Sequence, residues 1–369
     1  MSAGGGTPAS VPARPLLSGL YHVVPLGPDR VVIANAGRKI TLSAPGFTER
    51  VGPFLAALDG ASTADELCER FPNVAPPVLA GLAAKGLLDD AAPVPDGPAG
   101  APQSCALALP GAPSPAGTAA RLTATTVAVF GCGPTGGAVA VLLAKAGVGR
   151  LMLTDDGCTD DDVAVSPVLQ PTDDGLPRAG AVAGQCRDLT SAHVEVHVDV
   201  DVVADSLPHD PPDLAVVELG YDGTPTTVAD RLLGAGVPYL VHSQDALEAA
   251  VGPLVEPGGE PCHRCLAARR LGHVSHLDEH LAYLDHRATA RPRPDAFLAA
   301  QVSVVAGLVA TEALRALLEA DPRTRGAVLT VDLGGPVLRR EVLLPLPGCP
   351  SCAAAAAGLP MDAVAGSDL

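Results

Sequence analysis

Two Cys-x-x-Cys pairs, 84 positions apart, constrain this 369-residue chain more than any other feature. Cys262 pairs with Cys265, and Cys349 pairs with Cys352. The two-residue spacer lets both thiolates of a pair turn toward one ion, and two pairs complete the tetrahedral sulfur shell of a structural zinc site. Two redox pairs or two disulfides are the alternatives. A thioredoxin-like pair should open a helix after a strand, and neither pair is predicted to do so. We therefore expect one closed zinc site that joins two distant segments.

A glycine-rich turn is the second informative feature. An apolar strand over 127–130 runs into Gly131-Cys-Gly133-Pro-Thr-Gly136, and a helix over 138–146 and a strand ending at Asp155 follow. In such βαβ units the glycines let the backbone approach phosphates, and the acid at the strand end binds a ribose hydroxyl. The pattern predicts a nucleotide-binding fold. It does not distinguish NAD, FAD, S-adenosylmethionine and ATP from a fold that has lost its ligand.

Composition excludes several classes of protein. The chain has no Trp, only 2% aromatic residues and a formal net charge of −17, which argues against nucleic acid and anionic membranes as partners. No signal peptide and no apolar run long enough to span a bilayer is recognised. We expect a cytoplasmic protein with reduced thiols, which favours zinc over disulfides.

Turn residues and proline content divide the chain into segments. The predicted order is a disordered tail (1–15), a compact module (16–90), a Pro/Ala/Gly linker (91–120), a main domain (121–352) and a disordered end (353–369). The linker is expected neither to pack nor to form a helix.

The module at 16–90 is predicted to be α+β. The expected strands are 21–24, 30–34 and 39–42, and the expected helices are 48–58, 63–71 and 76–88. Ser62 or Thr63 with Glu66 is a plausible helix cap. In the main domain, strands alternate with helices, which predicts an α/β fold with a mainly parallel sheet covered on both faces. A long apolar helix over 295–319 and strands over 328–333 and 337–344 should precede the second cysteine pair.

These landmarks carry a resemblance. Gly131-x-Gly133, Gly147-Val-Gly149, Asp155, Gly175-Leu-Pro-Arg178 and the split cysteine pairs match, in order, those of ThiF/MoeB proteins, relatives of ubiquitin-activating enzymes. The stretch Val251-Gly-Pro-Leu-Val-Glu-Pro-Gly258 before the first pair resembles the ThiF-like, leader-binding partner protein of YcaO cyclodehydratases in azole-forming (TOMM) peptide biosynthesis. That resemblance implies a Rossmann-like ThiF domain with zinc, preceded by a PqqD-like, winged-helix-like recognition module.

The chain departs from the pattern of active adenylating members. The stretch 160–170 has no arginine, Arg178 stands where the resemblance implies a lysine, and Glu218-Leu-Gly-Tyr-Asp222 lacks the expected Asp-x-x-Asp-Asn. An ATP site needs cations to neutralise the triphosphate. We therefore expect a degenerate nucleotide site and no independent catalysis. Its residues would be Gly131, Gly133, Gly136, Asp155 and Arg178.

The resemblance implies a scaffold that binds a precursor leader peptide and delivers it to a YcaO-type, ATP-dependent enzyme. The leader would add as a strand to an open sheet edge. The expected contacts are Lys39, Ile40, Thr41 and Leu42 on the strand, with Val78, Leu79, Leu82 and Lys85 on the last helix.

Alternatives remain open. One alternative function is that of an ATP-dependent adenylyltransferase that activates a peptide or carrier-protein C-terminus. Another is that of a NAD-dependent dehydrogenase. The alternative for the module at 16–90 is a DNA-binding winged helix. Its last helix, over 76–88, carries Lys85 as its one basic residue, which is few for contacts with DNA phosphates. ThiF-like relatives are commonly dimers. A histidine-rich stretch follows the first cysteine pair, and it forms either a second metal site or a solvated polar segment. Its residues are His273, His276, His280 and His286, with Asp278, Glu279 and Asp285.

Overall fold

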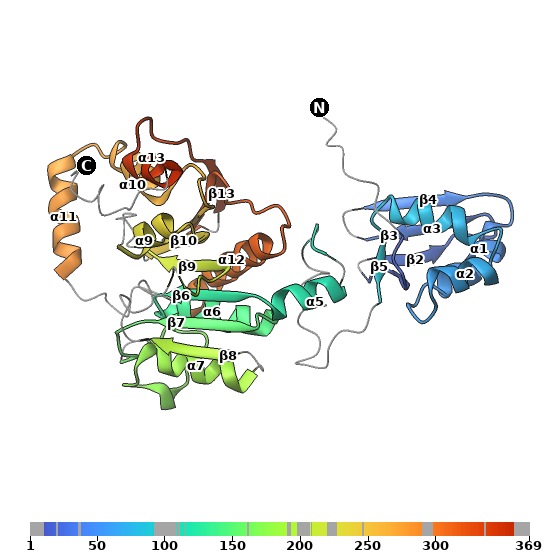
Figure 1. Ribbon diagram of the computed structural model, residues 1–369, viewed down its shortest axis with the longest axis horizontal. Helices are drawn as coiled ribbons and strands as arrows, with labels where there is room; N and C mark the ends of the chain where they lie inside the picture. Colours follow the sequence, from blue (N-terminus) through green and yellow to red (C-terminus); the bar gives the residue numbers. More distant parts are fainter. Residues whose placement is uncertain are drawn as a thin grey trace. The chain divides into compact units, whose positions relative to one another are not determined.

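The computed structural model describes residues 11–357, with gaps at 20, 36–37, 92–108, 110, 114, 161, 190–192, 198–206, 208, 220–226, 246, 290–297 and 336. The chain divides into two compact units, Met1–Ala120 and Arg121–Leu369, and each has its own hydrophobic core (Figure 1). Most of the predicted tails and of the predicted linker lies outside the described residues.

The N-terminal unit contains the three predicted strands and the three predicted helices. Strands β2 (His22–Pro25), β3 (Arg30–Ala34) and β4 (Lys39–Ser43) form an antiparallel sheet in that order. Helices α1 (Phe47–Ala56), α2 (Ala64–Arg70) and α3 (Ala75–Ala83) follow. Thr63 and Glu66 cap α2 through reciprocal hydrogen bonds, as predicted.

Two short strands of this unit were not predicted. β1 (Pro15–Leu17) pairs with β5 (Leu88–Asp90), and the Ala91 N–H donates to the Arg14 carbonyl oxygen at 2.9 Å. The folded module therefore begins before residue 16, inside the segment predicted as a tail. The prediction missed these strands because three residues are too few to show the alternation of apolar and polar side chains that marks a strand. Helix α3 ends at Ala83 instead of residue 88. Gly86 follows with φ 64°, a left-handed conformation that helices do not continue through.

The C-terminal unit is built on an eight-stranded sheet in the order β13-β12-β11-β10-β9-β6-β7-β8. The strands are β6 (Thr126–Phe130), β7 (Arg150–Thr154), β8 (His193–His197), β9 (Leu214–Glu218), β10 (Tyr239–Asp245), β11 (Glu248–Val255), β12 (Ala327–Asp332) and β13 (Val337–Val342). β10, β9, β6, β7 and β8 run parallel, and β11 to β13 extend the sheet antiparallel. The predicted mainly parallel α/β fold is confirmed.

Helices cover both faces of this sheet (Figure 1). One face carries α6 (Pro134–Ala146), α7 (Arg178–Leu189) and α12 (Ala299–Leu317), and the other carries α9 (Thr227–Ala235), α10 (His263–Leu271) and α13 (Pro350–Ala357). The remaining helical segments are α5 (Pro115–Thr123), α11 (Leu277–Thr289) and the 3-10 turn η1 (Pro171–Asp173). Among the described residues, α12 alone is long and apolar enough to cross a membrane. Its buried side chains pack against α6, so burial in the core accounts for its composition.

Several elements of this unit were missed or misassigned. α5 begins inside the predicted linker, which a proline in the first helical turn permits. β11 contains Gly252 and Pro253, which are typical of turns, and α10 is rich in polar residues. α13 extends into the segment predicted as a disordered end, and residues 358–369 lie outside the described part.

Candidate metal centre and nucleotide-type crevice

The two cysteine pairs lie at the beginnings of two helices. Cys262 is the N-cap of α10 and Cys265 lies in its first turn, while Cys349 directly precedes α13 and Cys352 lies in its first turn. The expectation that neither pair opens a helix was therefore wrong. The positive end of a helix dipole favours a thiolate, so both helix starts suit metal binding.

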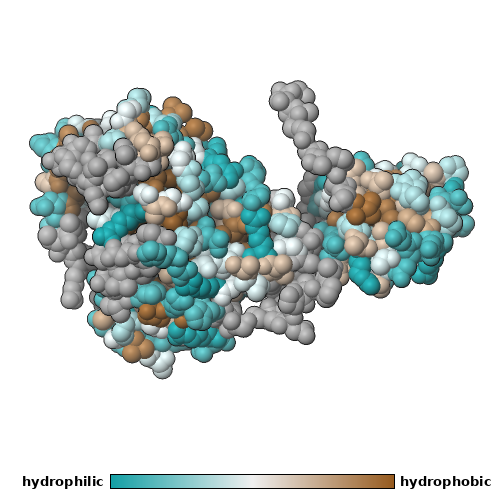
Figure 2. Space-filling view, viewed as in Figure 1, coloured by the Kyte–Doolittle hydropathy of each residue, from teal (hydrophilic) through white to brown (hydrophobic). Residues whose placement is uncertain are grey.

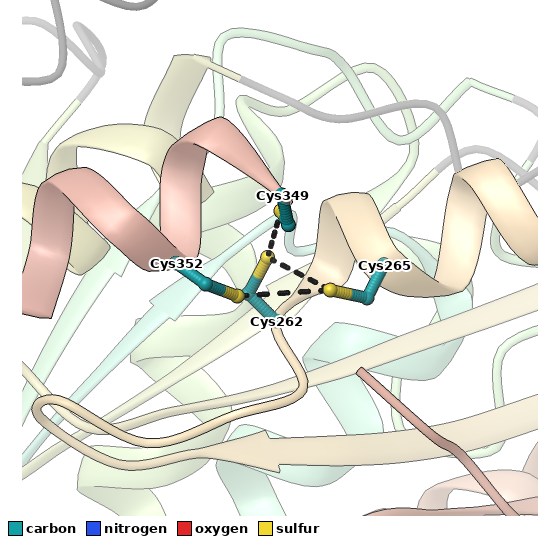
Figure 3. A group of neighbouring side chains, drawn as sticks. All are labelled: Cys262, Cys265, Cys349 and Cys352. Atoms are coloured by element: carbon teal, nitrogen blue, oxygen red, sulfur yellow. Dashed lines mark hydrogen bonds between the residues drawn. The ribbon is translucent and has the colours of Figure 1, made fainter. Parts of the chain in front are cut away.

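All four sulfur atoms converge, and every pair lies within 4.8 Å (Figure 3). The sulfur–sulfur distances are 3.9 Å for Cys262–Cys265, 3.8 Å for Cys262–Cys349 and 3.6 Å for Cys265–Cys352. A tetrahedral ion with Zn–S bonds of about 2.3 Å requires sulfur–sulfur edges of about 3.8 Å. The four side chains are buried, with exposed fractions of 4% or less. They therefore fit a closed structural zinc site.

A polar network supports the first pair from outside. The backbone N–H of Leu346 donates to Cys265 Sγ at 3.4 Å. His263, between the first two cysteines, is fully buried, and its Nδ1 lies 2.6 Å from the Tyr239 hydroxyl. Its Nε2 lies 3.1 Å from Asp230, which also accepts two hydrogen bonds from Arg264. Burial alone would raise the pKa of Asp230, but the hydrogen bonds from His263 and Arg264 lower it to about 2.

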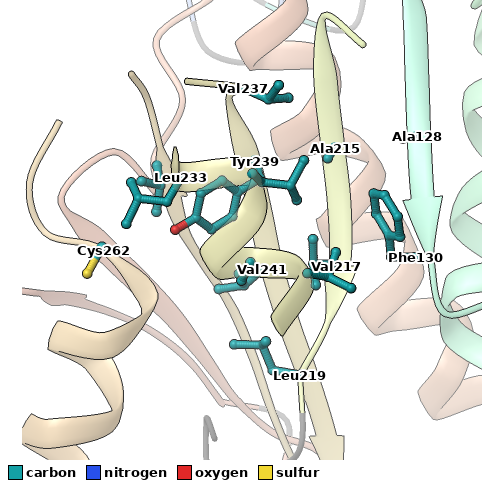
Figure 4. Packing of buried hydrophobic residues seen from close by; sticks show 14 of the residues in the cluster. Ala128, Phe130, Ala215, Val217, Leu219, Leu233, Val237, Tyr239, Val241 and Cys262 are labelled. Atoms are coloured by element: carbon teal, nitrogen blue, oxygen red, sulfur yellow. The ribbon is translucent and has the colours of Figure 1, made fainter. Parts of the chain in front are cut away.

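Tyr239 lies within the core that contains the cysteines. Leu233 and Val241 lie near its ring, and Val237 and Cys262 belong to the same buried cluster (Figure 4). Contacts of this kind beyond the ligands fix the ligand geometry of metal sites.

The glycine turn at 131–136 has backbone geometry that excludes side chains. Gly131 has φ 94°. A Cβ added at Gly136 would lie 1.9 Å from the Gly131 carbonyl oxygen, so β6 and α6 approach too closely for any larger residue. The turn lies beside β9, where the strand order reverses and ligands of α/β folds bind.

Asp155, predicted to bind a ribose, already holds the turn together. Its carboxylate accepts hydrogen bonds from the backbone N–H groups of Cys132, at 2.6 Å, and Gly157, at 2.7 Å. Arg178 is also engaged. Its Nε and Nη2 donate to the carboxylate of Asp162, and its Nη1 lies 3.8 Å from Asp155. The one cation predicted for the nucleotide site is thus neutralised by acids of the protein.

Three further polar residues lie at this end of the sheet, and none was predicted as a site residue. Glu218 ends β9, and burial together with the charge of Asp155 raises its pKa to about 7. His242 lies beside it on β10 and is 1% exposed, with neither ring nitrogen bonded to any described residue. Gln244 accepts a hydrogen bond from the Thr135 hydroxyl at 2.7 Å. The signal for Glu218 was its place at the end of a buried strand.

The predicted leader-binding residues have mixed positions. Ile40 and Leu42 are half-buried on β4, Lys39, Thr41 and Lys85 are exposed, and Val78 is half-buried. Leu79 and Leu82 are each 2% exposed in the core of the N-terminal unit, so their assignment to an open cleft was wrong. Consecutive apolar residues on a short helix do not reveal which of them faces the core.

The histidine-rich segment does not form a second metal centre in the described part of the chain. His280 packs near Tyr283 on α11, and the four cysteines are the one group of converging metal ligands among the described residues.

Comparisons with known proteins agree with this geometry. The SAMP-activating enzyme E1 of Haloferax volcanii is 28% identical over 249 residues, which cover 63% of this chain and 82% of that protein. Crystal structures of E. coli MccB with ATP and of the microcin C7 biosynthetic enzyme MccB with N-formylated MccA have TM-scores of 0.69 and 0.68. Each is 16% identical and covers 92% of this chain and 99% of that one. PaaA has a TM-score of 0.61 at 20% identity, with 88% and 99% covered.

At these identities the solved structures show a shared fold. They cover 88–92% of this chain, whereas residues 121–369 make up only about two thirds of it. The likeness in fold therefore extends into both units. The sequence profile of the ThiF family matches residues 107–350. This range includes the glycine turn, the whole eight-stranded sheet and three of the four cysteines, all but Cys352. The chain belongs to the ThiF family.

Proposed function

We propose that this protein is a cytoplasmic scaffold that binds the leader of a ribosomally made precursor peptide and delivers it to a YcaO-type modifying enzyme of thiazole/oxazole (TOMM) biosynthesis. The observation that carries the proposal is the outer edge of β4 in the N-terminal unit, which pairs with no further strand in the described part of the chain. An extended peptide adds to such an edge through main-chain hydrogen bonds.

The ladder between β3 and β4 fixes which groups of β4 face outward. At the two ends of this ladder, the Ala44 N–H donates to the Asp29 carbonyl oxygen and the Asn35 N–H donates to the Arg38 carbonyl oxygen. In an antiparallel pair every second pair of opposite residues is hydrogen-bonded, so these two contacts identify the bonded pairs between them. Ile40 and Leu42 consequently bond to β3. The N–H groups of Lys39, Thr41 and Ser43 point to the open edge and are available to a fourth strand.

The opposite edge of the sheet is less suited to strand addition. The Leu26 N–H donates to Arg30, so by the same alternation the outward-facing positions of β2 are Val23 and Pro25. Proline has no N–H, and proline on an edge strand blocks pairing. This asymmetry of the two edges supports strand addition at β4 over strand addition at β2.

Apolar side chains beside β4 offer places for leader residues. Ile40, Leu42 and Val78 pack against the core while part of each remains exposed, and an apolar area lies over β4 and α3 in the view of Figure 2. Arg38, directly before β4, donates to the carbonyl oxygen of Lys85 at 2.9 Å and joins β4 to the turn that follows α3. This arrangement supports a PqqD-like, winged-helix-like reading of the module, without Leu79 and Leu82 as contacts.

The relatives support a role in peptide maturation. MccB, whose fold both units resemble, is a microcin C7 biosynthetic enzyme and has been solved with N-formylated MccA. In the present chain Arg178 is already paired with Asp162, which supports delivery of a substrate over activation by this protein. Tethering raises the effective concentration of the precursor at the partner's active site without chemistry by the scaffold.

The test removes one outward N–H from each edge in the full-length chain. Thr41→Pro should weaken binding of candidate precursor leaders encoded beside this gene by about tenfold or more, because the ladder to β3 stays intact while an edge donor is lost. Val23→Pro is the matched control on β2 and should bind as the unchanged chain does. Fluorescence anisotropy with labelled leaders measures both. Equal affinity of all three proteins would contradict strand addition at β4.

An ATP-dependent adenylyltransferase that activates a peptide or carrier-protein C-terminus is the second candidate. It is favoured by the intact glycine turn and by the likeness to the SAMP-activating enzyme. ATP–pyrophosphate exchange by this protein alone, abolished by Arg178→Ala, would establish this candidate over the scaffold. Absence of exchange together with leader binding supports the scaffold.

A further inference from the structure

The carboxylate of Glu218 lies against the glycine turn. A Cβ built on Gly131 would lie 2.9 Å from Glu218 Oε2, one on Gly133 3.5 Å from it and one on Gly136 3.8 Å from it. These three glycines surround the start of α6, a helix of 13 residues. A single carboxylate oxygen therefore approaches all three glycines of the turn.

This is the position at which an anion is expected. In βαβ units the turn glycines and the helix N-terminus together form a cradle for phosphate, because backbone N–H groups and the helix dipole attract negative charge. Here the negative group beside the cradle belongs to the protein itself. β9 and β6 are hydrogen-bonded neighbours, so the sheet holds Glu218 at this place.

We infer that Glu218 acts as a built-in competitor of phosphate, which excludes nucleotides from the glycine turn while it is ionised and admits them once it is protonated or replaced by a neutral residue. The inference deepens the proposed scaffold function, because it names the residue that keeps the ThiF-type crevice free of ATP.

The charges around Glu218 strengthen this exclusion. Asp155 after β7 and Asp162 in the following loop are both acidic, and Arg178 on α7 is paired with Asp162. Cys132 in the turn is a buried thiol whose pKa is raised by burial and by the charges of Asp155 and Glu218, so it stays neutral. His242 on β10 has its pKa lowered to about 4 by burial and is uncharged at neutral pH. A triphosphate would thus meet a net negative site.

Titration of Glu218 makes the exclusion dependent on pH. Its pKa is raised to about 7, so the side chain is mostly ionised at pH 8 and mostly neutral at pH 6. Affinity for an anionic ligand should rise as the pH falls through 7. His242, with its pKa near 4, and Cys132, with its pKa raised well above the ordinary value, do not change charge over this interval. The phosphate of the ligand itself titrates near this pH, and a variant without the carboxyl group controls for that.

Isothermal titration calorimetry of the full-length protein with ATP in excess Mg²⁺, at pH 8 and pH 6, tests the inference. Glu218→Gln is expected to bind ATP at least about tenfold more tightly than the unchanged chain at pH 8, and the two should approach each other at pH 6. Glu218→Ala should behave like Glu218→Gln, which guards against a fault peculiar to one variant. Glu341→Gln, an exposed acid on β13, is the matched control and should leave affinity unchanged.

Two results would overturn the inference. One is equal affinity of the unchanged chain and Glu218→Gln at pH 8. The other is weaker binding by Glu218→Gln, which would mean that Glu218 holds Mg²⁺ for the nucleotide. Leader binding at β4 is measured without ATP, so failure of this inference and failure of the scaffold function are distinguishable.

Discussion

The hydroxyl of Tyr239 lies 2.6 Å from Nδ1 of His263, the residue between the first two cysteines of the metal centre. Both side chains are fully buried. The contact joins β10 of the sheet to the first turn of α10, so the ligand-bearing turn is fixed to the core independently of the metal.

Tyr239→Phe is expected to lower the free energy of unfolding by about 1–2 kcal/mol, since a buried imidazole nitrogen loses its partner. The ring and its packing are retained, so the loss reports the hydroxyl alone. Urea denaturation of the zinc-loaded protein measures it. Unchanged stability would mean that Nδ1 finds another partner.

The four-cysteine centre should hold one zinc ion per chain. Cys349→Ser is expected to lose the zinc and to unfold the C-terminal unit at a markedly lower temperature, because binding at a closed thiolate site is coupled to folding. Elemental analysis and thermal unfolding follow the two effects. Cys158→Ser, at an exposed cysteine outside the centre, should retain the zinc. A full zinc content in Cys349→Ser would refute the four-sulfur site.

Two glycine substitutions should have opposite effects. Gly136→Ala places a Cβ 1.9 Å from a carbonyl oxygen and is expected to destabilise the protein by about 3 kcal/mol or more. Gly184 on α7 has open space around it, so Gly184→Ala should stabilise by about 0.5–1 kcal/mol through helix propensity. Urea denaturation compares them. Equal effects would show that the turn relaxes on substitution.

Glu218 should also make stability depend on pH. Its pKa is about 7 in the folded protein against an ordinary value of 4.5, so folding favours the protonated form. The stability it contributes is present below pH 4.5 and is lost as the pH rises to 7, by up to about 3 kcal/mol.

Glu218→Gln has no carboxyl group to ionise, so it does not lose this stability as the pH rises. The variant should therefore be more stable than the unchanged chain at pH 8 and about equally stable at pH 5. Urea denaturation at both values separates this effect from other pH-dependent groups, which the two proteins share. A constant difference between them would contradict the raised pKa.

Sequence reasoning succeeded where chemistry repeats at a fixed spacing. The cysteine pairs and the glycine turn identified the fold and the convergence of the metal ligands. The resemblance carried the expectation of a degenerate crevice, and the ion pair between Arg178 and Asp162 supplies a physical basis for it.

Tertiary packing decided the rest. Leu82 and Val78 look alike in the sequence, yet Leu82 is in the core and Val78 only half-buried. The approach of Glu218 to the turn depends on β9 pairing with β6, across 87 residues. The helices at the cysteine pairs were missed because α10 carries no amphipathic pattern and α13 is almost uniform alanine.

The separation of the metal ligands has a consequence for the order of synthesis. Cys262 is made 87 residues before Cys349, and α12, β12 and β13 are made between them. Until the second pair emerges from the ribosome, the first is an incomplete ligand set that can oxidise locally. Over this interval the nascent chain carries two thiols with an incomplete ligand set, and four sulfurs can enclose one ion only after both pairs have been made.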